Sequence, residues 1–512
     1  MAARKKAVAE IISKLTKVKT RKQLDALKRS AGKKHGLAQM ISNSELLEAV
    51  KGDAVKRRIL RMNPGRSLSG VSVVAVMTKP LPCPGTCIYC PGGKTSPKSY
   101  TGHEPAALRA SQNKFDAFKQ VRSRLEQLEA SGHDPEKCEL IVMGGTFNST
   151  PLRYQNDFVR RTYDAFNGKK SKTLEQAIKL NETAKHRVVG FTFETRPDWA
   201  SRKQLKHLLG YGATRIELGV QSLDEAVLRK VKRGHGIAAV EESTRDCKDA
   251  FLKVCYHVMP GLFSNARKDE AMFKQLFEDD QFKPDMLKVY PCLVMPGTKL
   301  YEMWARGEYE PYSSKQAASV LAKCKKHVPE YCRIMRVERD IPTHQIGAGI
   351  PNTNLREMVV AEMKKRGETC KCIRCREPRA KKIDWRAVKL VRRDYEASGG
   401  QEVFLSFEDS KNDLLLGFLR LRKTKRFWVE GGEQEAAGVR ELHVYGEAVP
   451  IGAASKAVQH KQFGKKLLHE AEQIAKQEWG FKELRVLSGV GVRAYYRKLG
   501  YDLKSGYMLK TL

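Results

Sequence analysis

Short apolar runs alternate with helical stretches over residues 71–350, and this alternation limits the fold more than any other feature. The runs are rich in Val and Ile, and helical patterns such as 105–130 and 223–233 separate them. Continuous apolar strands with helical crossovers are typical of parallel sheets. Right-handed crossovers place the carboxyl ends of all such strands on one rim. The sequence therefore predicts a parallel α/β sheet or barrel. The predicted strands are VSVVAVM (71–77), ELIVMGG (139–145), RVVGFTFE (187–194), RIELGVQS (215–222), VCYHVMPGL (254–262) and MLKVYPCLV (286–294).

The pattern changes after about residue 391. Two strand-like runs flank a turn at Lys411–Asn412, and a third run, a helix, a strand and a short helix follow. This order predicts a compact α+β domain over residues 391–512, which is close to the usual domain size. The predicted elements are the strands 403–409, 413–423, 439–446 and 483–488 and the helices 462–478 and 491–499.

The charge balance points to a polyanionic partner. The chain has 95 Lys and Arg against 58 Asp and Glu, a formal net charge of +37. Such an excess is typical of proteins that bind nucleic acid, an acidic membrane or the ribosome. It is densest in residues 1–61, predicted as a basic helical arm, and in the linker 361–390. We expect these two segments to bind the polyanionic partner from either side of the barrel.

The sequence predicts a cytoplasmic protein. Its longest apolar runs fall short of a membrane span, and the basic N-terminus lacks the features of a secretory signal. Six of the 12 cysteines form two tight triads, which favours metal binding over disulfides in a reducing compartment.

The first triad, Cys83-x3-Cys87-x2-Cys90, follows a predicted strand directly. Three thiolates can hold three irons of a cubane cluster and leave the fourth iron open for a substrate. The alternative is a structural zinc site, for which His103 is the nearest fourth ligand. The spacing, with Tyr89 before the last cysteine, resembles that of the radical S-adenosylmethionine superfamily.

That resemblance implies a partial (β/α) barrel over residues 62–360 that holds a [4Fe–4S] cluster and S-adenosylmethionine. The alternative interpretation is that Glu194 and Gln221 are solvated or structural polar residues. Glu217 is a further candidate, either as a partner of the cofactor ribose or as a structural residue. The cofactor-binding residues that the resemblance implies are Tyr89, Gly144, Gly145, Glu194 and Gln221.

The C-terminal domain resembles the GNAT acetyltransferases, which bind acetyl-CoA. A loop that feeds a helix presents free backbone N–H groups, which suits a pyrophosphate. Gln462 stands where the family has its first glycine, and a side chain there crowds the pyrophosphate unless its φ is negative. Tyr495 or Tyr496 is implied as the group that protonates the leaving thiolate, with the other tyrosine in the core. The implied coenzyme residues are Glu441, Leu442, His443, Val444, Phe463, Gly464 and Lys465.

The second triad, Cys370-x-Cys372-x2-Cys375, lies in the linker between the two domains. Three close thiolates suit Zn²⁺, which prefers four ligands and stabilises short segments without a core. We predict a structural zinc with Cys332, His327 or His344 as the fourth ligand. A second iron–sulfur cluster and three unrelated thiols are the alternatives.

A chain that combines these two domain types resembles the Elongator catalytic subunit family, of archaeal or bacterial type. The motifs that carry this resemblance are SYTGHEP (99–105), MGGTF (143–147), FTFETRPDW (191–199), RELHVYG (440–446) and SGVGVRAYYRKLGY (488–501). The family implies an acetyl-CoA-dependent tRNA uridine-34 acetyltransferase that carboxymethylates C5 of the wobble uridine in the anticodon stem-loop. It also implies a coenzyme-facing Lys137, a chain that acts alone or as a homodimer, and an electron donor that the sequence does not identify. A protein lysine acetyltransferase with a structural iron–sulfur cluster, and a non-catalytic tRNA-binding scaffold, are the rival interpretations.

Overall fold

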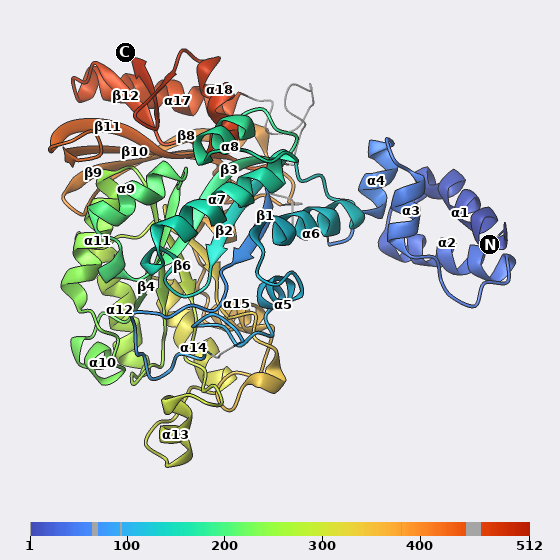
Figure 1. Ribbon diagram of the computed structural model, residues 1–512, viewed down its shortest axis with the longest axis horizontal. Coiled ribbons are helices and arrows are strands. Elements are labelled where there is room, and N and C mark those ends of the chain that lie inside the picture. Colours follow the sequence, from blue (N-terminus) through green and yellow to red (C-terminus); the bar gives the residue numbers. More distant parts are fainter. Residues whose placement is uncertain (1, 64–69, 93–94, 380, 447–461) are drawn as a thin grey trace.

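The N-terminal segment is a helical unit that projects to one side of the molecule (Figure 1). The computed structural model describes residues 2–63, 70–92, 95–379, 381–446 and 462–512. Thr20 and Ser42 cap the second and third helices by accepting a hydrogen bond from the backbone three residues on. The four helices bury their own apolar core. They are α1 (Ala2–Lys14), α2 (Arg21–Lys34), α3 (Asn43–Ala49) and α4 (Ala54–Leu60).

Seven parallel strands in sequential order form an open half-barrel. The predicted partial (β/α) barrel is therefore confirmed. Each of the six predicted strands has its counterpart, but β5 ends before the predicted Met259–Leu262 and β6 ends before the predicted Tyr290–Val294, and β7 was not predicted. The strands are β1 (Ser72–Met77), β2 (Lys137–Met143), β3 (Arg187–Thr195), β4 (Arg215–Gln221), β5 (Lys253–Val258), β6 (Met286–Val289) and β7 (Arg333–Arg336).

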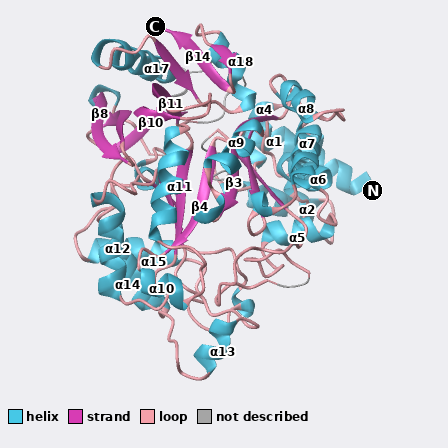
Figure 2. Ribbon diagram, turned by 60° about the vertical axis from the view of Figure 1, so that its left-hand side comes forward, coloured by secondary structure: helices cyan, strands magenta, loops and turns pink. Residues whose placement is uncertain are grey.

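Helices cover the outside of the half-barrel (Figure 2). The predicted helix 105–130 is two helices, because Lys114 and Phe115 have φ values of +52° and +56° and break it. The helices are α5 (Pro105–Gln112), α6 (Ala117–Ala130), α7 (Leu152–Asn167), α8 (Leu174–Asn181), α9 (Arg202–Gly210), α10 (Glu225–Lys230), α11 (Ile237–Asp249), α12 (Ala266–Glu278), α13 (Lys299–Ala305), α14 (Ser314–Lys325), α15 (Leu355–Lys365) and α16 (Ile373–Arg376).

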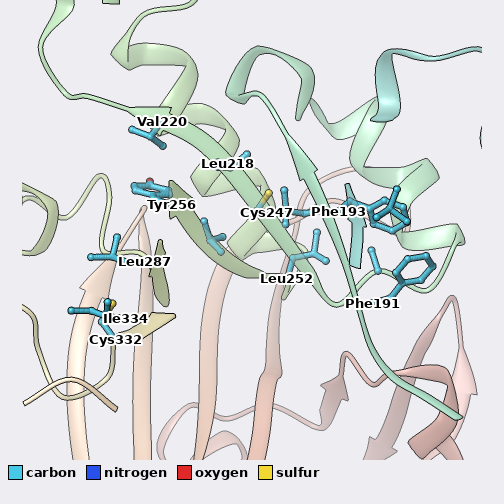
Figure 3. Close-up of a cluster of buried hydrophobic side chains, with 14 of the residues drawn as sticks. Phe191, Phe193, Leu218, Val220, Cys247, Leu252, Tyr256, Leu287, Cys332 and Ile334 are labelled. Carbon is cyan, nitrogen blue, oxygen red and sulfur yellow. The ribbon is translucent and has the colours of Figure 1, made fainter. Parts of the chain in front are cut away.

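The main core lies between the strands and these helices (Figure 3). Phe191 and Phe193 of β3 are almost fully buried, and their ring centroids lie 4.4 Å apart. Such aromatic pairs are stabilised by packing beyond their apolar area. This core fixes the strands whose inner surface and carboxyl ends carry the candidate site.

The C-terminal domain is a second seven-stranded sheet, which confirms the predicted α+β domain. Its strands pair antiparallel except for β11 and β12. The predicted helix 462–478 is an α-helix followed by a π-helical turn over Ile474–Glu478. The elements are β8 (Val388–Ala397), β9 (Gly400–Asp409), β10 (Leu414–Phe427), β11 (Gln434–Val444), α17 (Phe463–Gln473), β12 (Glu483–Val486), α18 (Arg493–Arg497), β13 (Asp502–Lys504) and β14 (Tyr507–Thr511).

Buried ion pairs join this sheet to the amino-terminal edge of the half-barrel. Arg440 of β11 donates to Asp285 before β6, with one nitrogen–oxygen distance of 2.8 Å, and Arg422 of β10 lies 2.6 Å from Asp249. All four side chains are at most 1% exposed. Paired charges in such a dry interface hold a defined geometry, because either partner alone is costly to bury. Among the described residues, no helix has the length and apolar character needed to cross a membrane.

Candidate functional site

One cavity of about 2110 Å³ reaches from the half-barrel's carboxyl rim to the C-terminal sheet. Tyr89 and Gln221 line it at the rim, and Leu442, Gly464 and Tyr495 line it at the far end. Both groups of residues that the sequence singled out therefore border the same space. The cavity is large enough for more than one substrate, since drug-sized ligands occupy about 300–1,000 Å³.

The first triad lies on the loop that leaves β1 at the carboxyl rim. Cys83, Cys87 and Cys90 are half-buried. Arg233 donates to Cys87 Sγ at 3.4 Å, and Cys83 Sγ lies 3.7 Å from the hydroxyl of Thr146. Burial, followed by the neighbouring Cys87, raises the pKa of Cys90 to about 11. A metal bound at this loop would have to displace the proton of Cys90.

The geometry of this triad fits an iron–sulfur cluster better than zinc. Zn²⁺ bonds each sulfur at about 2.3 Å in a tetrahedron, which requires neighbouring sulfurs about 4 Å apart. The sulfurs of this triad, all in described residues, do not lie together within 4.8 Å. In a cubane cluster each cysteine bonds a different iron, so its sulfurs are wider apart. Buried polar atoms without partners in the described structure also surround the loop, namely Tyr89 Oη, Arg196 Nη1 and Arg233 Nε. These residues fit the cluster and a polar cofactor beside it.

The rim residues predicted for S-adenosylmethionine lie at successive strand ends. Gly144 and Gly145 have φ values of +121° and +74°, and a Cβ on Gly144 would lie 2.3 Å from Thr78 Oγ1. Only glycine fits that approach. Gln221 has φ +70° and lines the cavity. Glu194 accepts a hydrogen bond from Tyr100 at 2.6 Å and one from Lys288 at 3.1 Å.

A charged network that the sequence did not predict continues along the inner face of the barrel. Glu217 is fully buried and accepts from Lys288, and His257 Nε2 lies 2.8 Å from its carboxylate. Burial opposes ionisation of Glu217, but Lys288, His257 and Arg215 outweigh it and hold its pKa well below the usual range. The sequence signal that could have revealed this network is a charged residue within an apolar strand, namely Lys288 in MLKVY and His257 in VCYHV. Glu217 is therefore part of this charged network, which is the structural role named above as one of its two possible roles.

The coenzyme residues gather where β11 ends and α17 begins. A Cβ on Gly464 would lie 3.2 Å from Tyr495 Oη and 3.7 Å from Val444, so the bare glycine leaves a gap there. His443 Nε2 and Ser488 Oγ are buried without a partner in the described structure. An open slot with unpaired polar atoms fits a coenzyme thioester arm. The lining residues here are Lys137, Glu441, Leu442, His443, Val444, Gly464 and Lys465.

Phe463 and Gln462 differ from expectation in different ways. Phe463 is 6% exposed and stacks on Phe407 with ring centroids 4.4 Å apart, so it packs rather than lines the slot. Gln462 has φ +57°, so the condition of a negative φ is not met. Lys137 is half-buried at the start of β2, where burial lowers its pKa. The predicted loop residues before Gln462 lie outside the described part.

The two tyrosines of α18 have different surroundings. Tyr495 is 37% exposed and points its hydroxyl at Gly464, whereas Tyr496 is 6% exposed in the domain core beside Tyr501. Burial raises the pKa of Tyr495, which keeps it a proton donor at neutral pH. Two ion pairs anchor the helix to the barrel, from Arg493 (3.1 Å) and Arg497 (2.6 Å) to Glu182. Both tyrosines border the cavity, and the Tyr495 hydroxyl is the one that lies beside Gly464.

The second triad is tightly closed. The sulfurs of Cys370, Cys372 and Cys375 all lie within 4.8 Å of one another, and Cys372 is buried. Hydrogen bonds from Cys370 and Cys375 hold the pKa of Cys372 well below its usual range. Lys325 Nζ lies 3.9 Å from Cys375 Sγ. This arrangement suits a zinc ion, which binds thiolates at short mutual distances.

None of the three predicted fourth ligands joins this group. His327 lies 3.3 Å from Glu270, and His344 packs edge-on against His103. Cys332 is fully buried, and its carbonyl accepts from Ile373 at 3.0 Å, but its sulfur is outside the 4.8 Å set. A second set, Glu217 with Cys255 and His257, is occupied by the ammonium of Lys288 and offers no place for a cation.

Comparison with known proteins matches successive parts of the chain to known domain families. Residues 82–276 match the model of the radical SAM superfamily, and residues 284–365 match the radical SAM C-terminal domain. Residues 375–501 match the acetyltransferase (GNAT) family. A Methanocaldococcus jannaschii protein named tRNA uridine(34) acetyltransferase is 48% identical over 92% of this chain and 90% of its own length. The chain belongs to this family.

The family extends to eukaryotic proteins. Elongator complex protein 3 of Saccharomyces cerevisiae is 42% identical over 98% of this chain and 94% of its own length. A solved structure of the archaeal Methanocaldococcus infernus Elp3, lacking its N-terminus, has a TM-score of 0.78 and 45% identity. It covers 87% of this chain and 100% of that one. The Elongator resemblance of the motifs is thereby confirmed.

Proposed function

We propose that the chain is an acetyl-CoA-dependent tRNA uridine-34 acetyltransferase that carboxymethylates C5 of the wobble uridine. The observation that carries this proposal is the single cavity of about 2110 Å³ bordered by both the triad loop and the coenzyme slot. A lysine acetyltransferase needs only the slot and has no use for a passage to the cysteine loop. Family membership supports the same activity.

The residues at the rim would hold the radical cofactors. Cys83, Cys87 and Cys90 would bind a [4Fe–4S] cluster, and Gly144, Gly145, Glu194 and Gln221 would contact S-adenosylmethionine. Together these groups, when bound, supply a carbon radical that removes a hydrogen from the acetyl methyl. The chain's own part would be to surround that chemistry, because limiting the access of water reduces side reactions.

At the other end, β11 and α17 would orient acetyl-CoA. Gly464 leaves room for the thioester beside Tyr495, whose hydroxyl is the proton donor to the departing thiolate. Its raised pKa keeps the phenol protonated at neutral pH. Lys137, at the start of β2, would face the coenzyme from the barrel side.

The basic segments would bind the RNA. Arg58 and Arg124 line the cavity on the side of the helical arm, and Arg374 lines it from the second triad. Phosphate contacts from both sides would position an unstacked uridine in the cavity. A zinc ion on Cys370, Cys372 and Cys375 would fix the second basic segment. The homodimer stays a prediction, and sedimentation of the purified chain tests it.

Nucleoside mass spectrometry tests the function. Reconstituted protein is incubated anaerobically with tRNA, acetyl-CoA and S-adenosylmethionine, and the tRNA is digested. We expect 5-carboxymethyluridine only when all three components are present. Acetylation of a histone-like peptide with unmodified tRNA would instead support the lysine acetyltransferase.

A further inference from the structure

Arg420 of β10 is a buried cation that joins β11 to the amino-terminal ends of two barrel strands. Its side chain is fully buried, and Nη1 lies 3.6 Å from Asp285, just before β6. Nε donates to Glu441 of β11 at 2.9 Å, and Nη2 donates to the carbonyl of Tyr331, just before β7, at 2.7 Å. The planar guanidinium presents its donors in a fixed fork. These contacts therefore set the position of β11 relative to both barrel strands.

Glu441 faces the cavity and is held from two sides. One carboxylate oxygen accepts from Arg420, and the other lies 4.0 Å from Nζ of Lys253, the first residue of β5. Glu441 and Lys253 line the cavity, and residues 442–444, the next along β11, line the coenzyme slot. Arg420 is not among the described residues that line the cavity. It therefore acts on the cavity wall through Glu441.

An irregularity in β11 turns Glu441 toward the barrel. The pairing of β10 with β11 shifts by one residue at Arg420, which leaves Arg440 as an extra residue. Successive side chains of a regular strand point to opposite faces, but Arg440 and Glu441 both reach barrel residues. Bulges of this kind re-aim side chains and are frequent beside active sites. The bulge thus supplies the carboxylate that Arg420 holds.

Arg422, two residues along β10, fastens the same interface without touching the cavity wall. It is also fully buried, and it lies 2.6 Å from Asp249 at the end of α11 and 3.0 Å from Glu402 of β9. Neither Arg422 nor these two partners is among the described residues that line the cavity. The two arginines therefore share strand, burial and interface, and differ in their link to the cavity.

We propose that Arg420 is a positioning residue for carboxymethylation, which through Glu441 holds the coenzyme strand so that the acetyl methyl reaches the radical site. The proposal rests on the proposed function and gives Arg420 no bond-making step. A reacting group displaced by about 1 Å can lose about 100-fold in rate. When the acetyl methyl is out of reach, the C–H bond that breaks belongs to another donor. The 5′-deoxyadenosine then forms without a hydrogen from the acetyl group.

The test compares Arg420→Lys and Arg420→Met with the matched control Arg422→Lys. Lysine keeps a positive charge but cannot donate from one rigid fork to both Glu441 and the carbonyl of Tyr331. The loaded protein receives tRNA, S-adenosylmethionine and acetyl-CoA with a deuterated methyl group. Mass spectrometry gives the fraction of 5′-deoxyadenosine that carries deuterium. This fraction is counted per molecule formed, so a loss of folded protein leaves it unchanged. Calorimetry on the metal-free protein measures the affinity for acetyl-CoA.

We expect the labelled fraction to fall about threefold in Arg420→Lys and about tenfold in Arg420→Met, with acetyl-CoA affinity within about threefold of the wild type. Arg422→Lys should keep the wild-type fraction. An unchanged fraction in both Arg420 variants, or an equal fall in Arg422→Lys, would overturn the proposal. So would a loss of acetyl-CoA affinity with an unchanged fraction, because Arg420 would then shape the coenzyme slot alone. A wild-type protein that forms no labelled 5′-deoxyadenosine would instead count against the proposed function.

Discussion

The two cysteine triads have similar sequences and different geometries. The first, Cys83, Cys87 and Cys90, lies half-buried on the loop after β1 with sulfurs that do not gather within 4.8 Å. The second, on Cys370, Cys372 and Cys375, gathers its sulfurs and buries its middle cysteine. The first faces a cavity through Tyr89, and the second packs between the half-barrel and the C-terminal sheet. The open geometry of the first triad suits a reactive metal group, and the closed geometry of the second triad suits a structural metal.

Removal of one sulfur from the open triad should abolish activity and spare the fold. We expect Cys87→Ala to lose iron and to make no 5-carboxymethyluridine above background, because three thiolates are needed to hold the cluster. Its Tm should stay within a few degrees of the wild type. Metal analysis, nucleoside mass spectrometry and thermal unfolding check this. A Cys87→Ala variant that keeps full iron content and activity would contradict the catalytic role given to the first triad.

The same difference between a functional and a structural residue applies to the two tyrosines of α18. Tyr495→Phe should lower turnover of acetyl-CoA by about 100-fold, since it removes a proton donor. Tyr496→Phe, which removes a hydroxyl in the core, should change turnover far less. The rate of tRNA-dependent CoA release measures both. Equal losses in the two variants would remove the role given to Tyr495.

The closed triad should matter for stability. Cys372→Ala should lose zinc and lower Tm by about 5 °C or more, because a structural metal contributes to folding. A chelator should lower the Tm of the wild type by a similar amount and leave that of the variant unchanged. Differential scanning calorimetry with zinc analysis is the measurement. An active, zinc-free protein of unchanged Tm would show that the three thiols are incidental.

The smallest effect concerns the ion pair beside the closed triad. Arg376 of α16 bonds Glu408 of β9, and the pKa of Glu408 is lowered to about 2, because Arg376 and Arg393 outweigh the effect of burial. The folded-state pKa lies below the unfolded one, so this stabilisation is present above about pH 4 and is lost as the pH falls toward 2. Glu408→Gln should cost about 2 kcal/mol at pH 7 and less at low pH.

Urea unfolding at several pH values measures that difference. Glu396→Gln is the matched control, since Glu396 is exposed on β8, and it should change stability by less than about 0.5 kcal/mol. A cost for Glu408→Gln that stays constant from pH 7 to pH 3 would contradict the assigned ion pair.

The sequence was sufficient for the elements with strong local signals. The six apolar runs of the barrel and the carboxyl-end positions of Glu194 and Gln221 follow from strand periodicity and crossover rules. Strand β7 did not follow, because Arg-Ile-Met-Arg is short and polar and becomes a strand only by pairing with β6. Strand β8 was not predicted for a similar reason, because half of its ten residues are charged.

The site residues that sequence reasoning could not place depend on contacts between distant segments. The separation of Tyr495 from Tyr496 requires the position of α17 relative to α18. The role of Lys288 depends on β3 and β4, which bring Glu194 and Glu217 to its ammonium. That none of the predicted fourth ligands reaches the second triad likewise depends on how residues 327–344 pack against the linker.

The central claim is that one cavity lets the acetyl group on the coenzyme side reach the radical site at the triad loop. Acetyl-CoA with a fully deuterated methyl group, supplied with tRNA and S-adenosylmethionine under anaerobic conditions, tests this most directly. Mass spectrometry of the 5′-deoxyadenosine formed in single turnover is the measurement. The account predicts 5′-deoxyadenosine that carries one deuterium, while 5-carboxymethyluridine forms in the tRNA. Formation of 5-carboxymethyluridine with unlabelled 5′-deoxyadenosine would contradict it.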